Sequence, residues 1–285
     1  MPELPEVETV RKGLEAPLVG ARLARVDLRR PDLRFALPAA FSSRLTGARI
    51  LALERRGKYI IGRLDSGEAL LIHLGMTGRF TIEGPAADAR PTSARSAAPA
   101  RASHAHIVFE TDAGDVVTYF DARRFGSMDL FSARGLEEAL SKLGPEPLGA
   151  GFTADHLRRA FQGRRAGVKA LLLDQAIVAG LGNIYACESL HRAGISPLAS
   201  AGRLPRRKLE RLVLAIREVL AEAIAAGGST LRDYAAADGS LGYFQHRFRV
   251  YGREGEECPR VECPGLVRRA VQAGRASFYC PGCQR

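Results

Sequence analysis

The chain has 285 residues, a hydrophobic fraction of 46% and a formal net charge of +11 at pH 7. This length and composition exclude wholesale disorder and accommodate two domains with a small appendage. No apolar run approaches a membrane span and no secretory signal opens the chain, so we expect a cytoplasmic protein with reduced thiols. The basic balance favours a polyanionic partner, nucleic acid first and an anionic membrane surface second.

The amino terminus reads MPELPEVETV, with Pro2 directly after the initiator methionine. Such a start is either a frayed tail that contains prolines or a reactive amine held by the helix that follows. That helix is predicted over Glu6 to Leu18, because apolar residues recur at helical spacing from Val7 and Pro5 suits the position before it.

Short alternating runs separated by turns follow from Ala21 to about Leu130. KYIIGRLDSGEALLIHLGM and HIVFETDAGDVVTYFD each contain two strand-like runs around a glycine-containing turn, which predicts β-hairpins. Several such hairpins imply an antiparallel sandwich or barrel. Residues 84–103 are rich in Ala, Pro, Ser and Arg, and we expect a long mobile loop there.

Helical patterns replace strand patterns after Gly144. TADHLRRAF begins with a cap at Thr153, and helices are predicted over VKALLLDQAIV and NIYACESLHRAG. PRRKLERLVLAIREVLAEAIAAGG is the longest predicted helix and ends at the glycine pair beginning with Gly227.

Asn183 stands at a predicted helix start, after a turn with two glycines. The N–H groups and dipole of such a start favour a phosphate, but an asparagine there more often caps the helix with its side chain. Arg164, Arg165 and Lys169 lie just upstream and favour nucleic acid.

Four cysteines lie near the end of the chain as C-x4-C and C-x2-C pairs: Cys258, Cys263, Cys280 and Cys283. Two thiolate pairs on turn-like knuckles suit one tetrahedral zinc ion in a closed, structural site. Disulfides disagree with a cytosolic setting, and four unconnected buried thiols would not explain the close pairs. Cys187 is a lone core cysteine.

The segment between the two pairs, LVRRAVQAGRASFY, alternates and carries Arg268, Arg269 and Arg275. Arginines on a zinc hairpin suit a phosphate backbone or groove. A solvated basic surface explains them equally well.

Motifs in order along nearly the whole chain resemble bacterial formamidopyrimidine-DNA glycosylase: MPELPEVETV, GKYI, HLGMTGRF, DARRFG, DQAIVAGLGNIYACESL, GYFQ, VYGREGEEC and GRASFYCPGCQ. The resemblance implies an α+β fold, in which a helix precedes an N-terminal antiparallel β-sandwich, followed by a helix-two-turn-helix domain and a zinc finger. It places the three domains at residues 1–135, 136–248 and 249–285. The implied activity is excision of oxidised purines, such as 8-oxoguanine and formamidopyrimidines, followed by strand cleavage at the abasic site.

The resemblance also implies catalytic roles for four residues. Methionine removal exposes the secondary amine of Pro2, and an α-amino group titrates near pH 8, so more of it is free base than of a lysine. Its attack on sugar C1′ and the later elimination explain base release and strand cleavage together. Glu3 transfers protons, and Glu6 anchors the terminus. Lys58 matches a lysine that contacts the lesion-flanking phosphate, although by itself it reads as a surface lysine. Arg275 matches an arginine used on phosphate and in the second elimination.

Further residues match groups that bind the damaged duplex. Met76 and Phe125 match the wedge that fills the space of the extruded nucleotide, and Arg123 matches the arginine that pairs with the orphaned cytosine. As bare residues, Met76 and Phe125 are more often core. Contacts with the DNA backbone are implied for His73, His104, Arg165 and Asn183, and residues 229–245 are implied to close over the extruded base.

Two departures from the family pattern are the C-x4-C knuckle, where C-x2-C is usual, and the 84–103 insert. Two alternatives stay beside the main interpretation: an endonuclease VIII-like enzyme for oxidised pyrimidines, and a non-catalytic DNA-binding protein. Pro2, Lys58 and Arg275 favour an enzyme. We expect one structural zinc ion, damaged double-stranded DNA as the partner, no membrane contact and a monomer.

Overall fold

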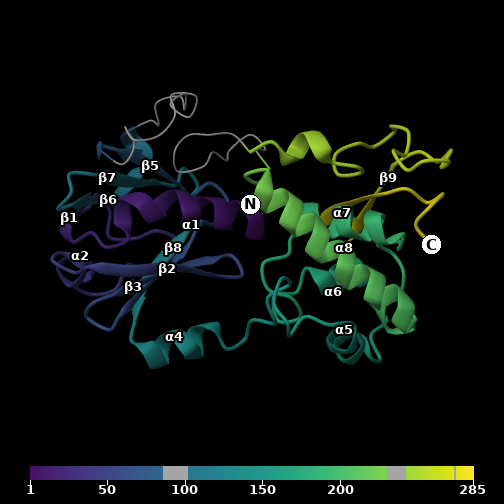
Figure 1. Ribbon diagram of the computed structural model, residues 1–285, viewed down its shortest axis with the longest axis horizontal. Coiled ribbons are helices and arrows are strands. Elements are labelled where there is room, and N and C mark those ends of the chain that lie inside the picture. The colour runs from purple at the N-terminus through teal and green to yellow at the C-terminus, as the bar shows by residue number, and fades with distance from the viewer. Residues whose placement is uncertain (86–101, 230–241, 273) are drawn as a thin grey trace. The chain divides into compact units, whose positions relative to one another are not determined.

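The computed structural model describes residues 1–85, 102–229, 242–272 and 274–285 (Figure 1). It contains two compact units, Met1–Ser141 with Ala226–Tyr243 and Lys142–Ala225 with Phe244–Arg285. Most of the predicted 84–103 loop and of the predicted 229–245 closing segment lies outside the described residues.

The first unit is built from two antiparallel sheets of four strands each, in the orders β1-β6-β7-β5 and β2-β3-β4-β8. Its elements are α1 (Leu4–Leu18), β1 (Leu23–Leu28), α2 (Phe41–Leu45), β2 (Ile50–Arg56), β3 (Tyr59–Leu64), β4 (Ala69–His73), β5 (Arg79–Glu83), η2 (Ala102–His104), β6 (Ala105–Thr111), β7 (Val116–Phe120), β8 (Ser127–Phe131) and α4 (Ala133–Leu140). The predicted sandwich with a preceding helix is confirmed.

Helix α1 lies between the two sheets (Figure 1) and contacts strands of both. Its apolar stripe, with Val7, Val10 and Leu14, joins one core with side chains from both sheets, such as Ile72 and Phe109. Burial of this stripe explains why a helix of ordinary length is stable here. The helix begins at Leu4, two residues before the predicted start, and Pro5 lies inside its first turn.

Strand β4 is apolar at successive positions because both of its faces are covered. Ile72 points into the main core, whereas Leu71 packs with Ile61 and with Leu136 of α4 on the outer face. The sequence ALLIH therefore lacks the alternation of a strand with one wet face.

Helix α2 was not predicted, since the region from Ala21 was expected to hold strands alone. Phe41 and Leu45 stand four residues apart and are both buried in the main core. This i, i+4 pair is the periodic signal of one helical turn.

The second unit is helical with a small hairpin. Its elements are α5 (Ala154–Phe161), α6 (Val168–Leu172), α7 (Asn183–Ala193), η3 (Ala201–Arg203), α8 (Arg206–Ala225), η4 (Phe244–Arg247), β9 (Arg268–Gln272) and β10 (Arg275–Tyr279). Thr153 caps α5 as predicted, accepting a hydrogen bond from the His156 N–H at 3.1 Å. The long helix α8 and its end before Gly227 are also confirmed.

Helix α6 is much shorter than the helix predicted over VKALLLDQAIV. The Gln175 side chain accepts from the Gly180 N–H at 2.8 Å and donates to the Leu181 carbonyl at 2.9 Å. These bonds satisfy backbone groups of a turn and compete with a continued helix. Among the described residues, no helix combines the length and the apolar character that a membrane crossing requires.

Candidate active site, DNA-contacting loops and metal centre

The amino terminus is a packed element, so a frayed tail is the wrong alternative. Pro2 and Glu3 are buried ahead of α1, and Glu3 forms a capping box with Glu6. One oxygen of Glu6, Oε2, accepts from the Glu3 N–H at 2.9 Å. The other, Oε1, accepts from the N–H of Ser229 at 2.8 Å and from its hydroxyl at 2.9 Å. Glu6 thus anchors the residues next to the candidate nucleophile.

Contacts along α1 show where its first residues lie. Arg11 Nη1 donates to the Leu53 carbonyl at 3.0 Å, and Glu8 Oε2 accepts from Arg55 Nε at 3.0 Å. Toward its amino terminus, α1 therefore follows β2 toward the turn that contains Lys58. Pro2 comes two residues before α1 begins at Leu4, so these contacts direct the amino terminus toward that turn.

Lys58 lies in the turn before β3, and His73 ends the neighbouring strand β4. Lys58 is 6% exposed and precedes Tyr59, which pairs with His73 across β3 and β4. Burial, together with the charges of Lys58 and Arg34, lowers the pKa of His73 to about 4. His73 Nδ1 accepts from the Gly75 N–H at 3.1 Å, so the neutral ring carries its proton on Nε2. The structure thus groups two predicted contact residues with Arg34.

The loops that carry Met76 and Phe125 are in backbone contact. Gly75 has a φ of +63°, and a Cβ at this position would lie 2.2 Å from the backbone carbon of Phe125. Only glycine allows this approach. Arg123 N donates to Thr77 Oγ1 at 3.1 Å, which joins the two loops a second time.

Phe125 is 44% exposed, so it is not a core residue. The Arg123 guanidinium lies 4.8 Å from the centre of its ring. Met76 is half-buried in the adjacent turn. A cation, an aromatic ring and a thioether are therefore presented together.

Asp121 holds the two loops together through hydrogen bonds to both of them. The sequence analysis did not identify this residue. It is fully buried. Its carboxylate accepts from the Thr77 hydroxyl at 2.5 Å, from the Gly126 N–H at 2.7 Å and from the Tyr119 hydroxyl at 3.3 Å. The signal that was available is the aspartate that opens DARRFG, since short acidic side chains often order turns.

His104 is bonded to the backbone of Asp121, whereas Arg165 belongs to the second unit. His104 ends η2 and is half-buried, and its carbonyl accepts from the Asp121 N–H at 3.1 Å. Arg165 is exposed in the second unit, in the turn before α6.

In the second unit, side chains of α6 and α7 donate hydrogen bonds to the same carbonyl of the hairpin β9–β10. The Ala276 carbonyl accepts from Asn183 Nδ2 at 3.0 Å and from Lys169 Nζ at 2.8 Å. Asn183 is the first residue of α7 and Gly182 is its cap, so of the two roles considered for Asn183 the side-chain cap is excluded. Lys169 is 1% exposed, which corrects its grouping with the surface arginines. Arg275 precedes Ala276 and is exposed.

The four predicted cysteines converge on one point. Their sulfur atoms all lie within 4.8 Å of one another, with 3.7 Å between Cys258 and Cys283 and 3.6 Å between Cys263 and Cys280. A regular tetrahedron with Zn–S bonds of about 2.3 Å has sulfur atoms about 3.8 Å apart. The cluster therefore has the geometry of a closed four-thiolate metal site, despite the longer first knuckle.

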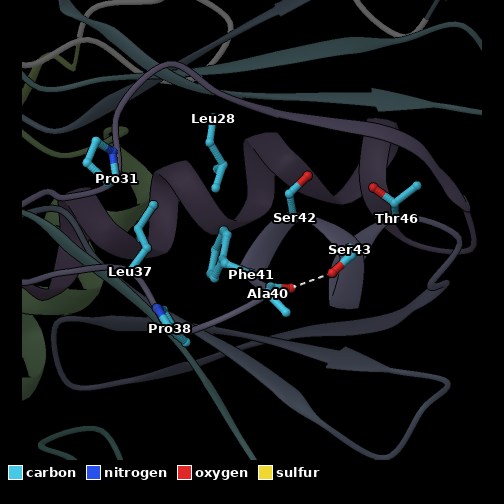
Figure 2. Close-up of a pocket in the computed structure, with 9 residues that line it drawn as sticks. All are labelled: Leu28, Pro31, Leu37, Pro38, Ala40, Phe41, Ser42, Ser43 and Thr46. Atoms are coloured by element: carbon cyan, nitrogen blue, oxygen red, sulfur yellow. Dashed lines mark hydrogen bonds between the residues drawn. The ribbon is translucent and has the colours of Figure 1, made fainter.

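An apolar hollow of about 640 Å³ lies elsewhere on the first unit (Figure 2). Leu28, Leu37 and Phe41 line it together with hydroxyl-bearing side chains such as Ser42. Its lining includes no titratable residue and no predicted site residue, so it lacks the groups for acid–base or nucleophilic chemistry.

Models of two known domains match most of the chain. The formamidopyrimidine-DNA glycosylase N-terminal domain matches residues 1–128, and the formamidopyrimidine-DNA glycosylase H2TH domain matches residues 143–235. A formamidopyrimidine-DNA glycosylase of Caulobacter vibrioides is 59% identical, and one of Phenylobacterium zucineum is 59% identical, each over 100% of both chains. The chain belongs to the formamidopyrimidine-DNA glycosylase family.

Solved structures of this family agree in fold. A mutant of the Lactococcus lactis FPG, in complex with DNA containing Fapy-dG, has a TM-score of 0.85 and 33% identity over 100% of both chains. A MutM complex with DNA containing carbocyclic 8-oxo-G has a TM-score of 0.84 and 33% identity over 100% of both chains. The family assignment and the α+β fold inferred from the motifs are thus confirmed.

Proposed function

We propose that this chain removes oxidised purines from duplex DNA and then cleaves the strand through a Schiff base at Pro2. The observation that carries this proposal is the anchored amino terminus, where Pro2 is buried ahead of α1 and Glu6 bonds the Glu3 N–H. Family relatives bound to Fapy-dG and 8-oxo-G DNA support the substrate class.

The proposed reaction begins once Met1 has been removed. The Pro2 nitrogen attacks C1′, the bond from C1′ to the base breaks, and the base leaves after it takes up a proton. Ring opening gives an iminium ion, which acidifies the 2′ proton. Loss of that proton breaks the C3′–O bond, and a second elimination releases the 5′ phosphate. Water finally hydrolyses the iminium ion, which frees the Pro2 amine and leaves the sugar remnant as an aldehyde.

The other site residues are assigned from the motifs that they share with the family. Glu3, one peptide bond from the amine, moves protons during ring opening and elimination. Lys58 is assigned to the phosphate beside the lesion. Arg275, exposed on the hairpin, is assigned to phosphate and to the second elimination. Each role stays a prediction until its variant is measured.

The loops at Met76 and Phe125 are proposed to fill the space left by the extruded nucleotide, with Arg123 bonding the unpaired cytosine. His73, His104, Arg165 and Asn183 are proposed contacts of the DNA backbone. Asn183 donates one N–H of its amide to Ala276. The second N–H of that amide is the group we assign to a phosphate oxygen.

Zn²⁺ is the proposed metal of the four-cysteine cluster. When bound, it holds the two knuckles together and carries no step of the reaction. We also propose that the protein acts as a cytoplasmic monomer and that the division at residues 135 and 248 marks its domains. One zinc ion per chain by elemental analysis is the expected result, and a purified chain with full activity but no zinc would contradict it.

Borohydride trapping tests the central proposal. A duplex with one 8-oxoguanine opposite cytosine is incubated with the protein, and the cross-linked peptide is identified by mass spectrometry. The adduct is expected on Pro2, and Pro2→Gly should abolish it with Glu3 intact. Lys12→Gln, which removes an exposed amine elsewhere on α1, should leave it unchanged.

Three outcomes would overturn parts of the proposal. An adduct on a lysine would overturn the assignment of the nucleophile. Trapping only with oxidised pyrimidines would transfer the chain to the endonuclease VIII-like alternative. Tight binding with no adduct on any lesion would leave a non-catalytic DNA-binding protein.

A further inference from the structure

His191, in the last turn of α7, contacts the four-cysteine cluster without belonging to it. It is fully buried, and its Nε2 atom lies 3.5 Å from the sulfur of Cys258. Its Nδ1 atom is buried and has no hydrogen-bond partner among the described residues. The thiol is therefore the polar group that determines the orientation of this ring.

The chemistry of the pair determines which atom donates. A thiolate bound to a metal has no hydrogen and can only accept. A neutral imidazole has a single N–H, and placing it on Nε2 pairs it with sulfur. The other tautomer would bury an unpaired N–H and turn a nitrogen lone pair toward a negative sulfur, which costs free energy.

The first knuckle in turn holds the end of α7. Arg260, one of the residues between the first two cysteines, donates from Nη2 to the carbonyl of His191 at 2.8 Å and to that of Arg192 at 3.1 Å. These are terminal carbonyls of the helix, which ends at Ala193 and is capped by Gly194 with a φ of +66°. A cation at this end also complements the helix dipole. The longer C-x4-C knuckle thus supplies a cap for the helix that carries His191.

We propose that His191 is a hydrogen-bond donor to the Cys258 ligand of the metal site, and that Arg260 fixes the helix end from which it donates. This inference rests on the proposed zinc site. A donor N–H withdraws electron density from the sulfur, which makes the thiolate a poorer nucleophile and slows its attack by electrophiles. His191 is thus a positioning and protecting residue of the site and does not touch DNA.

The test uses the full chain loaded with zinc and two measurements. Zinc transfer to a chromogenic chelator gives the rate of metal release, and brief iodoacetamide treatment followed by mass spectrometry gives the alkylation of each cysteine. His191→Phe keeps a ring but removes the donor, and His191→Gln restores an N–H. Ser189→Ala is the matched control, because Ser189 is buried on the same helix and its hydroxyl has no partner among the described residues.

His191→Phe is expected to release zinc about tenfold faster than wild type, in line with the usual effect of such partners of a ligand. Its alkylation should increase first at Cys258. His191→Gln should recover part of the protection, Arg260→Met should accelerate release less, and Ser189→Ala should match wild type. Far-UV circular dichroism confirms that each variant is folded.

The two proposals fail in different ways. A wild-type chain without zinc would overturn both the metal assignment and the role of His191. Wild-type release and alkylation in a folded His191→Phe chain would overturn the role of His191 alone. Equal acceleration of alkylation at all four cysteines, without recovery in His191→Gln, would show a general loss of packing and would overturn it too.

Discussion

The buried carboxylate of Asp121 accepts several hydrogen bonds below the loops of the proposed wedge. Three donors from three different segments meet its carboxylate, and none of them belongs to a helix. A carboxylate accepts at both oxygens, whereas an amide accepts at one only. The position of Phe125 and Arg123 therefore depends on the hydrogen bonds of a single buried residue.

Asp121→Asn is expected to lower the free energy of unfolding by about 1–3 kcal/mol, because one backbone or hydroxyl donor is left facing an N–H₂ group. Urea unfolding of the full chain measures this change. Glu137→Gln, an exposed carboxylate on α4, is the control and should change stability by less than about 0.5 kcal/mol. Equal effects of the two variants would contradict the role assigned to Asp121.

His73 links pH to stability because its pKa is lowered to about 4 by burial and by the charges of Lys58 and Arg34. An unfolded histidine titrates near its usual value of about 6.5, so between these values the unfolded chain binds more protons. The contribution of His73 to the free energy of unfolding is therefore fully present above about pH 6.5 and is lost as the pH falls toward 4.

The His73→Asn variant removes this titration. Between about pH 7 and about pH 5.5, the free energy of unfolding of wild type should fall more than that of the variant, by up to about 1 kcal/mol. Urea unfolding at several pH values gives the two slopes. The same substitution at the exposed His246 should leave the wild-type slope, and a larger fall in His73→Asn would contradict the sign.

At the scale of elements, Glu188 connects α7 to the chain that enters the cysteine module. Its carboxylate accepts from the N–H groups of Arg249, Val250 and Tyr251, at 2.9, 3.0 and 2.8 Å. Burial raises the pKa of Glu188, and these three N–H groups counteract the shift. One buried acid on a helix thus fixes three consecutive residues of a segment that has no regular structure of its own.

Glu188→Gln should lower the free energy of unfolding by about 1–3 kcal/mol, because the amide nitrogen would face the Arg249 N–H. The measurement is urea unfolding with zinc present throughout, so that metal loss does not contribute. Glu210→Gln on the exposed face of α8 should stay within about 0.5 kcal/mol of wild type. A neutral result for Glu188→Gln would mean that the segment is held by its apolar contacts alone.

Elements with strong local signals were predictable, and elements fixed by distant partners were not. The sequence of α8 combines a periodic apolar face with a proline before it and a glycine pair after it, so its bounds agree with the prediction. The cysteine spacing likewise identified the cluster. The end of α6 depends on how the Gln175 amide bonds backbone groups, which no periodicity encodes.

Among the site residues, those in sequence motifs were predictable, and those that depend on partners distant in the sequence were not. The motifs identified Met76, Arg123 and Phe125, and the structure brings their loops together through Gly75 and Asp121. The partner of Lys169 is 107 positions away in the sequence, so its burial was not visible from neighbours. The supporting contact of His191 with Cys258 spans 67 positions and was missed for the same reason.

At the scale of the whole molecule, the net charge of +11 governs association with DNA. Each phosphate contact releases counterions, so the association constant should fall linearly with salt on logarithmic axes. We expect Arg165, a proposed phosphate contact, to contribute to this slope, and we expect surface arginines outside the interface not to contribute. This difference separates a defined interface from a diffuse basic surface.

Arg165→Gln is expected to reduce that slope by about 0.9 for a duplex with an uncleavable abasic analogue. Fluorescence anisotropy over a range of salt concentrations measures it. Arg134→Gln is the matched control, since Arg134 is an equally charged, 89% exposed side chain that pairs with Glu138 on α4. If both variants lowered the slope equally, the assignment of Arg165 to a phosphate would be wrong.

The two oxygens of Glu6 belong to one planar, rigid group, yet they serve different parts of the chain. One holds the Glu3 N–H and the other holds Ser229, the residue that opens the segment proposed to close over the extruded base. Loss of this one carboxylate would therefore release two parts of the chain at once, Ser229 and the residue next to the proposed nucleophile.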